Sequence, residues 1–287
     1  PGKGTENSMY DTLLHIKPAP QEREDILLVN IDDAAIEEVG AWPWSRDIIA
    51  DVLIHLREAG GMYAVFDIEY LSPSQTGVNR SYVKNEFPAL YSQAHSEILD
   101  NIKVFTEAIA TKSIPLSTVP EFGDQLSGDV DGLMNGLAGS ITGKIFQDND
   151  EYFARALRFF GRAYLTINAE KINTNEDAKP AEDYAFEHLL ISNVQDPHGL
   201  IIEENEKTRR DSQYDRGISP AILQLLSAGA GAGFPNVYID EDGVRRRIPL
   251  LVEYNGKYVA QLVFAPILDI LQPESLIRTG SKLVLKG

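Results

Sequence analysis

Residues 26–68 read ILLVNIDDAAIEEVGAWPWSRDIIADVLIHLREAGGMYAVFDI, and this stretch decides the fold class. The apolar run 26–31 has the length of a strand buried on both faces. Ser45 can cap a helix whose apolar residues recur at helical spacing, and 63–68 is the next strand. A strand, a helix and a strand in this order predict a βαβ unit with a right-handed crossover, and therefore a sheet that is at least partly parallel.

The downstream sequence extends this α/β pattern. Residues 150–161 and 219–228 predict further helices, and residues 162–167 and 236–239 predict further strands, the last of them followed by a turn at 240–243. Asp242-Gly243 and Asn255-Gly256 between apolar runs are hairpin signals, and 277–285 predicts a final strand. The expected fold is α/β, with a mixed, partly parallel central sheet, flanking helices and a C-terminal antiparallel hairpin.

Two stretches interrupt the pattern. Residues 74–149 contain helical patterns at 87–111 and 129–147, which predict a helical insertion. Residues 170–216 are charged and carry few apolar anchors, so we expect a long excursion there. The remaining sequence divides into an N-terminal helix and linker at 1–24 and one α/β domain at 25–287. The chain begins without Met and ends within a predicted strand, so we expect it to be a fragment whose membrane segments lie outside it.

Composition excludes several classes of protein. The chain has 287 residues, 43% of them hydrophobic, which is ordinary for a globular protein. Its 26 Lys and Arg against 43 Asp and Glu give a net charge of −17, and the run Arg245-Arg246-Arg247 is too short to offset it. Nucleic acid is therefore not an expected partner. The absence of Cys excludes disulfides and thiolate chemistry. No complete nucleotide or metal motif is present, so no cofactor is expected.

Four acids follow the two predicted strands. Asp32 and Asp33 come after the first strand, and Asp67 and Glu69 lie at the end of the second. Because ligands of open parallel sheets bind at the carboxyl ends of strands, these acids form a candidate site for a small ligand or a hard cation. The plainer interpretation, which we favour, makes Asp33 a helix cap and Asp67 an ion-pair partner of Arg46.

The most distinctive string is Trp42-Pro43-Trp44-Ser45-Arg46, which contains both tryptophans of the chain. We interpret it as a rigid structural corner. Trp42 and Trp44 are expected to cover the end of the sheet and to deliver Arg46 towards Asp32 or Asp67 for a bidentate ion pair. We predict that Arg46 and Asp67 form a buried structural pair.

The sequence resembles the CHASE type 2 family of extracytoplasmic sensor domains (cyclases/histidine kinases associated sensory extracellular). The matching residues occur in the family's order and are Tyr10-Asp11 with Leu14, ILLVNIDD at 26–33, Gly40 with Trp42–Arg46, VFD at 65–67, DEYFARALRFFG at 150–161, and Asn236 with DEDGVRRRIPL at 240–250. The departures are the insertion at 74–149 and the charged stretch 170–216.

The resemblance implies a non-enzymatic signal-input module on the periplasmic or extracellular side of a membrane-bound bacterial receptor. Transmembrane helices and a cytoplasmic output domain, most often an adenylate or guanylate cyclase, are the implied partners in the parent chain, together with an unidentified ligand. The family supplies no catalytic residues. The stripe Met9, Leu13 and Ile16 of the N-terminal helix is a candidate contact for a homodimer. The alternative hypothesis is a Mg-dependent phosphotransfer or hydrolase domain that uses Asp32, Asp33 and Asp67.

Overall fold

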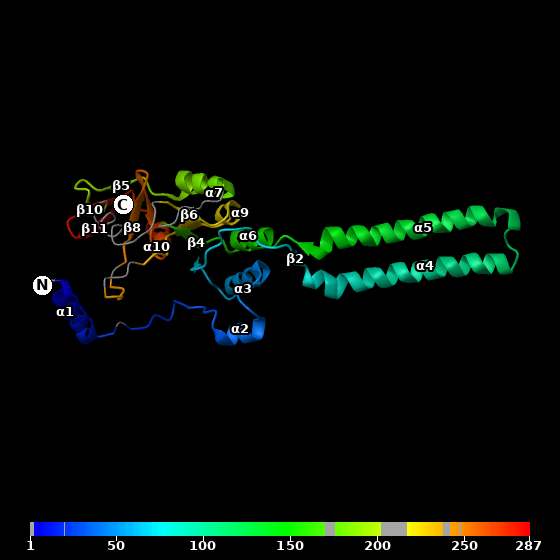
Figure 1. Ribbon diagram of the computed structural model, residues 1–287, viewed down its shortest axis with the longest axis horizontal. Helices are drawn as coiled ribbons and strands as arrows, with labels where there is room; N and C mark the ends of the chain where they lie inside the picture. Colours follow the sequence, from blue (N-terminus) through cyan, green and yellow to red (C-terminus); the bar gives the residue numbers. More distant parts are fainter. Residues whose placement is uncertain (1–2, 20, 170–175, 202–216, 238–241, 247) are drawn as a thin grey trace. The chain divides into compact units, whose positions relative to one another are not determined.

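The computed structural model describes residues 3–19, 21–169, 176–201, 217–237, 242–246 and 248–287. The chain divides into two compact units, Pro1–Trp44 and Ser45–Gly287. It is a mixed α/β protein with parallel strands and antiparallel hairpins, which confirms the predicted fold class (Figure 1). No helix within the described ranges is both long and apolar enough to span a membrane.

The first unit contains two helices, α1 (Lys3–Ile16) and α2 (Asp33–Val39). Gly40 ends α2 with φ 117°, a conformation that glycine adopts without steric cost. The strand predicted at 26–31 is wrong. These residues form no strand, and the side chains of Ile26, Leu27 and Leu28 are 70–79% exposed. An apolar run becomes a strand only where a neighbouring strand receives its hydrogen bonds, and the described sheets contain no such neighbour for it.

The central sheet of the second unit is built on β4 (Ala163–Asn168), whose six residues are all buried. β1 (Ala64–Val65) and β7 (Gly231–Gly233) pair with it in parallel, and β6 (Ser219–Pro220) pairs antiparallel with its carboxyl end. The second predicted strand, 63–68, is thus reduced to two paired residues. In the strand register, Tyr164 of β4 lies opposite both Val65 of β1 and Gly231 of β7.

Two predicted helices cover this sheet and form its core. α3 (Arg46–Glu58) and α6 (Asn149–Phe160) pack against each other, as their amphipathic sequences predict. Leu53 from α3 and Phe153 and Leu157 from α6 are at most 1% exposed. The short helices α7 (Lys179–Tyr184) and α9 (Leu223–Leu226) complete this layer.

The C-terminal part forms two small sheets. β8 (Leu251–Tyr254) and β9 (Lys257–Ala260) are the hairpin that Asn255-Gly256 predicts, and α10 (Phe264–Leu271) follows. The predicted final strand is instead a second hairpin of β10 (Ser275–Thr279) and β11 (Lys282–Lys286), which turns at Gly280 with φ 52°. β5 (Val194–Gln195) pairs in parallel with β10. These elements share a small core of Ile201, Leu251, Tyr258, Ala260, Phe264 and Leu276.

The predicted helical insertion is a helical hairpin. It leaves and returns through the paired strands β2 (Gly77–Val78) and β3 (Phe146–Gln147). Its long helices are α4 (Phe87–Ala110) and α5 (Val119–Ser140), which run antiparallel in Figure 1. The second helix starts ten residues earlier than the pattern at 129–147 indicated, because glycines in it obscure the periodicity. Three short helical turns flank the pair: η1 (Tyr82–Glu86), η2 (Leu116–Thr118) and η3 (Ile141–Ile145).

The predicted excursion at 170–216 lies partly outside the described residues. Its described part contains η4 (Glu176–Ala178), α7, η5 (Ala185–Leu189) and β5. Of the strand predicted at 236–239, residues 238 and 239 also lie outside the described ranges, and so does the start of the turn at 240–243. The helix predicted at 219–228 is shorter than expected, because Ser219 and Pro220 pair with β4 before α9 begins.

Candidate functional site

The carboxyl end of the central sheet carries a chain of polar side chains, Glu69, Asn168 and Asn236, which we call the carboxyl-edge cluster. Asn168 is the last residue of β4 and is 5% exposed. Its Nδ2 donates to Oε1 of Glu69 at 2.7 Å, and Asn236 Nδ2 donates to Asn168 Oδ1 at 3.3 Å. Asn236 Oδ1 accepts from the backbone N–H of Ala169 at 3.0 Å. The cluster therefore lies where open parallel sheets bind their ligands.

The four acids predicted as a site belong to different units. Asp67 and Glu69 are exposed residues of the second unit, just after β1. Asp32 and Asp33 belong to the first, where Asp32 caps α2 by accepting from Ala35 N–H at 2.9 Å. The cap is therefore Asp32, and Asp33 is the first helical residue. In the described parts of the chain, no group of three or more His, Asp or Glu side chains is placed to hold a metal ion.

A second polar cluster surrounds Arg46, the first residue of α3. Its Nη1 donates to Asp150 Oδ1, and its Nη2 donates to the carbonyl of Ser72. The second carboxylate oxygen of Asp150 accepts from the Ser74 N–H at 2.9 Å. The guanidinium also lies over the ring of Tyr70, 5.2 Å from its centroid. The side chains of Arg46 and Asp150 are only 10% and 7% exposed.

The predicted partner of Arg46 was wrong. The guanidinium pairs with Asp150, which lies in the first turn of α6, and not with Asp67, which is exposed. The physical reason is the packing of α3 on α6, which brings the first turns of the two helices together. Asp150 gains there from the positive end of the helix dipole. Its position at the head of the string DEYFARALRFFG was the available sequence signal.

The Arg46 cluster fastens the base of the helical hairpin. Asn149 Nδ2 donates to Ser45 Oγ at 2.8 Å, and a Cβ on Gly77 would lie 2.4 Å from the Asn149 amide. Gly77 belongs to β2, so glycine lets the hairpin's entry strand pass this close to α6 without displacing the Asn149 side chain. Ser72 and Ser74 lie on the segment that leads into the same strand. The cluster thus joins α3, α6 and the start of the insertion.

Burial has left two polar atoms of this region without a hydrogen-bond partner in the described structure, Tyr70 Oη and Asn149 Oδ1. Tyr70 is 6% exposed, and burial raises the pKa of its phenol well above the ordinary value, an effect that Arg46 partly opposes. The hydroxyl therefore stays protonated at physiological pH and cannot act as a base. This chemistry favours a structural role for the Arg46 cluster.

The two tryptophans form a local aromatic contact within the first unit, and Arg46 belongs to the second unit. The rings of Trp42 and Trp44 meet edge to face with centroids 5.8 Å apart. Trp44 Nε1 donates to the carbonyl of Gly40 at 2.7 Å, which ties the corner to the end of α2. Trp42 is 41% exposed, so its ring presents an open surface.

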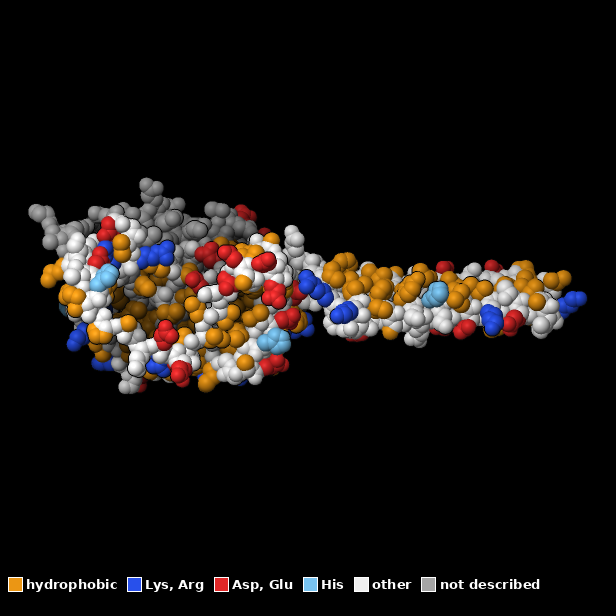
Figure 2. Space-filling model, turned by 90° about the horizontal axis from the view of Figure 1, so that it is seen from below, with side chains coloured by type: hydrophobic (Ala, Val, Ile, Leu, Met, Phe, Trp, Pro, Cys, Tyr) orange, Lys and Arg blue, Asp and Glu red, His pale blue; other side chains and the backbone are white. Residues whose placement is uncertain are grey.

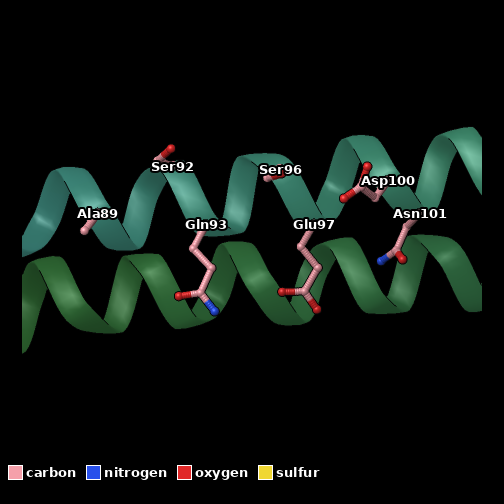
Figure 3. Close-up of a pocket in the computed structure, with 7 residues that line it drawn as sticks. All are labelled: Ala89, Ser92, Gln93, Ser96, Glu97, Asp100 and Asn101. Carbon is pink, nitrogen blue, oxygen red and sulfur yellow. The ribbon is translucent and has the colours of Figure 1, made fainter.

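One shallow pocket lies on the helical hairpin (Figure 3). All of its lining residues come from α4, and they are Ala89, Ser92, Gln93, Ser96, Glu97, Asp100 and Asn101. Gln93, Glu97 and Asn101 extend towards α5, whereas Asp100 points away from it. Because a single helix supplies the whole lining, this pocket cannot enclose a ligand. It marks the polar flank of the hairpin.

Sequence reasoning missed Asn168 and Asn236 as site residues. Asparagine carries no charge and completes no metal or catalytic motif, so only the strand pairing shows that the two amides meet. The available signals were positional, because Asn168 ends the apolar strand β4 and Asn236 follows the Gly-rich β7, and Asn236 is also one of the residues that match the family.

The chain matches one protein family along nearly its whole length. The model of the CHASE2 domain matches residues 2–285. No curated protein and no solved structure shows a significant match to the chain. CHASE2 domains are extracytoplasmic sensor domains and not catalytic ones. Since the match covers essentially the whole chain, the protein belongs to the CHASE2 domain family.

Proposed function

We propose that this domain is the signal-input part of a membrane-bound bacterial receptor whose cytoplasmic output is an adenylate or guanylate cyclase. The family match over residues 2–285 carries this proposal. Transmembrane helices and the output domain would lie in the parent chain. The domain would sit on the periplasmic or extracellular side of the inner or plasma membrane and bind a small ligand or ion.

Within the second unit, the carboxyl-edge cluster is the best candidate for the ligand-binding surface. Glu69 supplies an exposed carboxylate that contacts the amide of Asn168, which in turn contacts the amide of Asn236, and Asp67, two residues before Glu69, is a second exposed carboxylate. Carboxylate and amide oxygens suit a hard cation, and with the amide N–H groups they also suit a polar organic cation. Asp32 and Asp33 remain predicted ligand residues.

A thermal unfolding screen tests the ligand proposal. Mg²⁺, Ca²⁺ and small organic cations are added to the 287-residue chain. A ligand present at 100 times its dissociation constant stabilises the folded state by about 2.7 kcal/mol, which raises Tm by roughly 5–10 °C.

Glu69→Gln should abolish this shift, because it removes the carboxylate charge and keeps the size of the side chain. Glu187→Gln, at an exposed glutamate of η5, is the matched control and should retain it. A ligand that stabilises both variants equally binds elsewhere and contradicts the site. The receptor proposal is tested separately, by adding an identified ligand to membranes that contain the full-length parent and assaying cyclic nucleotide formation.

A further inference from the structure

The helical hairpin of α4 and α5 buries too little apolar surface to be stable on its own. Its two helices contain 24 and 22 residues, yet Ala94 is the one fully buried residue among them. The half-buried residues follow three- and four-residue spacings, as in a coiled coil. On α4 they include Phe87, Ile98, Asn101 and Phe105, in line with the buried Ala94, and on α5 they are Val119, Gly123, Leu126, Val130, Leu133, Leu137 and Ser140. A single seam between two helices leaves most of their apolar surface in water.

One flank of the hairpin is largely apolar along α4, and we call it the hairpin face, formed by Tyr91, His95, Leu99 and Ile102 of α4 with Met134 of α5. Tyr91, Leu99, Ile102 and Met134 are 54%, 52%, 42% and 52% exposed. The ring of His95 stacks on Tyr91 with an interplanar angle of 13°. Figure 2 shows hydrophobic side chains running along the hairpin. The four α4 residues recur at three- or four-residue intervals and therefore form one continuous stripe.

Met134 of α5 extends the same face. Ile102 directly follows the seam residue Asn101, and Met134 directly follows the seam residue Leu133. In an antiparallel pair, residues that directly follow a seam residue on either helix lie on the same face of the hairpin. The exposed Asp124 and Asp131 follow the seam residues Gly123 and Val130 and therefore share the α5 side of this face with Met134. The stripe on α4 carries no Asp, Glu, Lys or Arg, whereas the flank with Gln93 and Glu97 is polar (Figure 3).

We propose that the hairpin face is covered by the same face of a second copy of this chain, giving a four-helix bundle with two-fold symmetry. An antiparallel hairpin of two nearly equal helices is self-complementary when it is rotated by 180°, because each helix then meets one of matching length. Bundles of alternating up and down helices are a common result of such packing.

The available area suits a stable dimer. A helix of 24 residues is about 36 Å long, and two adjacent helices are about 20 Å wide, so the face offers on the order of 700 Å² per copy. Stable interfaces bury about 800 Å² per partner.

Charge argues against other occupants. The net charge of −17 disfavours nucleic acid and anionic lipid surfaces. The stripe on α4 is uncharged, so two such acidic chains can bring their α4 stripes together, whereas Asp124 and Asp131 are the carboxylates on the α5 side of the face. This inference is independent of the proposed receptor function.

Sedimentation equilibrium of the 287-residue chain, from micromolar to several hundred micromolar, tests the proposal. A monomer–dimer equilibrium is expected, and Ile102→Asp should raise the dimer dissociation constant by at least about tenfold, because it puts a charge into the apolar contact. Val104→Asp is the matched control. Val104 is 66% exposed but lies two residues further along α4, on the opposite flank, and its replacement should leave the dimer intact.

Single-cysteine variants give a second measurement that does not require a destabilising charge. The chain has no Cys, so Ile102→Cys and Val104→Cys each supply one defined thiol. A bis-maleimide should link two copies of the Ile102→Cys protein much faster than two copies of the Val104→Cys protein. A monomer at every concentration, equal cross-linking of the two variants, or a dimer weakened equally by both aspartates would overturn the proposal.

Discussion

The buried pair between Arg46 and Asp150 should be among the most costly polar contacts of this domain to break. In the Arg46→Ala variant, the Asp150 carboxylate stays buried and keeps only the Ser74 N–H as a donor. In Asp150→Ala, the guanidinium keeps the Ser72 carbonyl and the Tyr70 ring. Removing one partner of a buried ion pair typically costs about 3–5 kcal/mol, and we expect each variant to fall in this range.

Replacing both partners should cost much less than the sum of the single changes. The double variant Arg46→Met and Asp150→Leu leaves no stranded charge and fills similar volume, so we expect a loss of about 1–2 kcal/mol. The double-mutant cycle uses the same substitutions singly, Arg46→Met and Asp150→Leu, for which we expect the same losses of about 3–5 kcal/mol each. The coupling energy, measured by urea unfolding of all four proteins, should therefore be at least about 4 kcal/mol.

Two controls define the result that would refute this reasoning. Arg158 pairs with Glu151 at 2.8 Å on the same helix, but these side chains are 50% and 42% exposed, so Arg158→Ala should cost no more than about 1 kcal/mol. Asp67→Asn should be nearly neutral, because Asp67 is exposed. Additive effects below 1 kcal/mol for Arg46 and Asp150, or a large loss for Asp67→Asn, would show that the pair does not hold α3 to α6.

Three further predictions concern titration and helix stability. The hydrogen bond from Tyr152 to Asp51 at 2.6 Å, and secondly burial, raises the pKa of the Tyr152 phenol to about 12. The contribution of this hydrogen bond to the free energy of unfolding is therefore present below pH 10 and is lost as the pH rises through 12. Asp51→Asn should lower the pKa of Tyr152, measured by absorbance titration of the phenolate. Hydrogen bonds from Arg246 lower the pKa of the Asp242 carboxyl to about 2. The stability that these bonds contribute is therefore present above pH 4 and is lost as the pH falls through 2. In Arg246→Gln, the pKa of Asp242 followed by NMR should return towards 3.8. No atom lies within 4 Å of a Cβ built on Gly132 in α5. Gly132→Ala should therefore raise the free energy of unfolding, measured in urea, by about 1 kcal/mol, because alanine favours the helix. An unchanged or lower stability would contradict the open space beside Gly132.

The sequence by itself determined the elements whose signals are local. The helices α3 and α6, the strand β4 and the hairpin at Asn255-Gly256 were predicted because amphipathic periodicity, caps and turn residues act over a few neighbouring positions. The ordered strings of the family likewise sufficed for the family assignment. The N-cap role of the Asp32-Asp33 pair was foreseen to within one residue.

Only the tertiary structure decided which distant groups meet. An apolar run states that a segment can be buried but not which neighbour will pair with it, and residues 26–31 accordingly form no strand. Arg46 could have paired with any acid at the same end of the sheet, and the crossing of α3 over α6 selected Asp150. Asn168 and Asn236 are 68 residues apart in sequence, and the pairing of β4 with β7 makes their amides neighbours. Such contacts depend on chain topology, which no local pattern records.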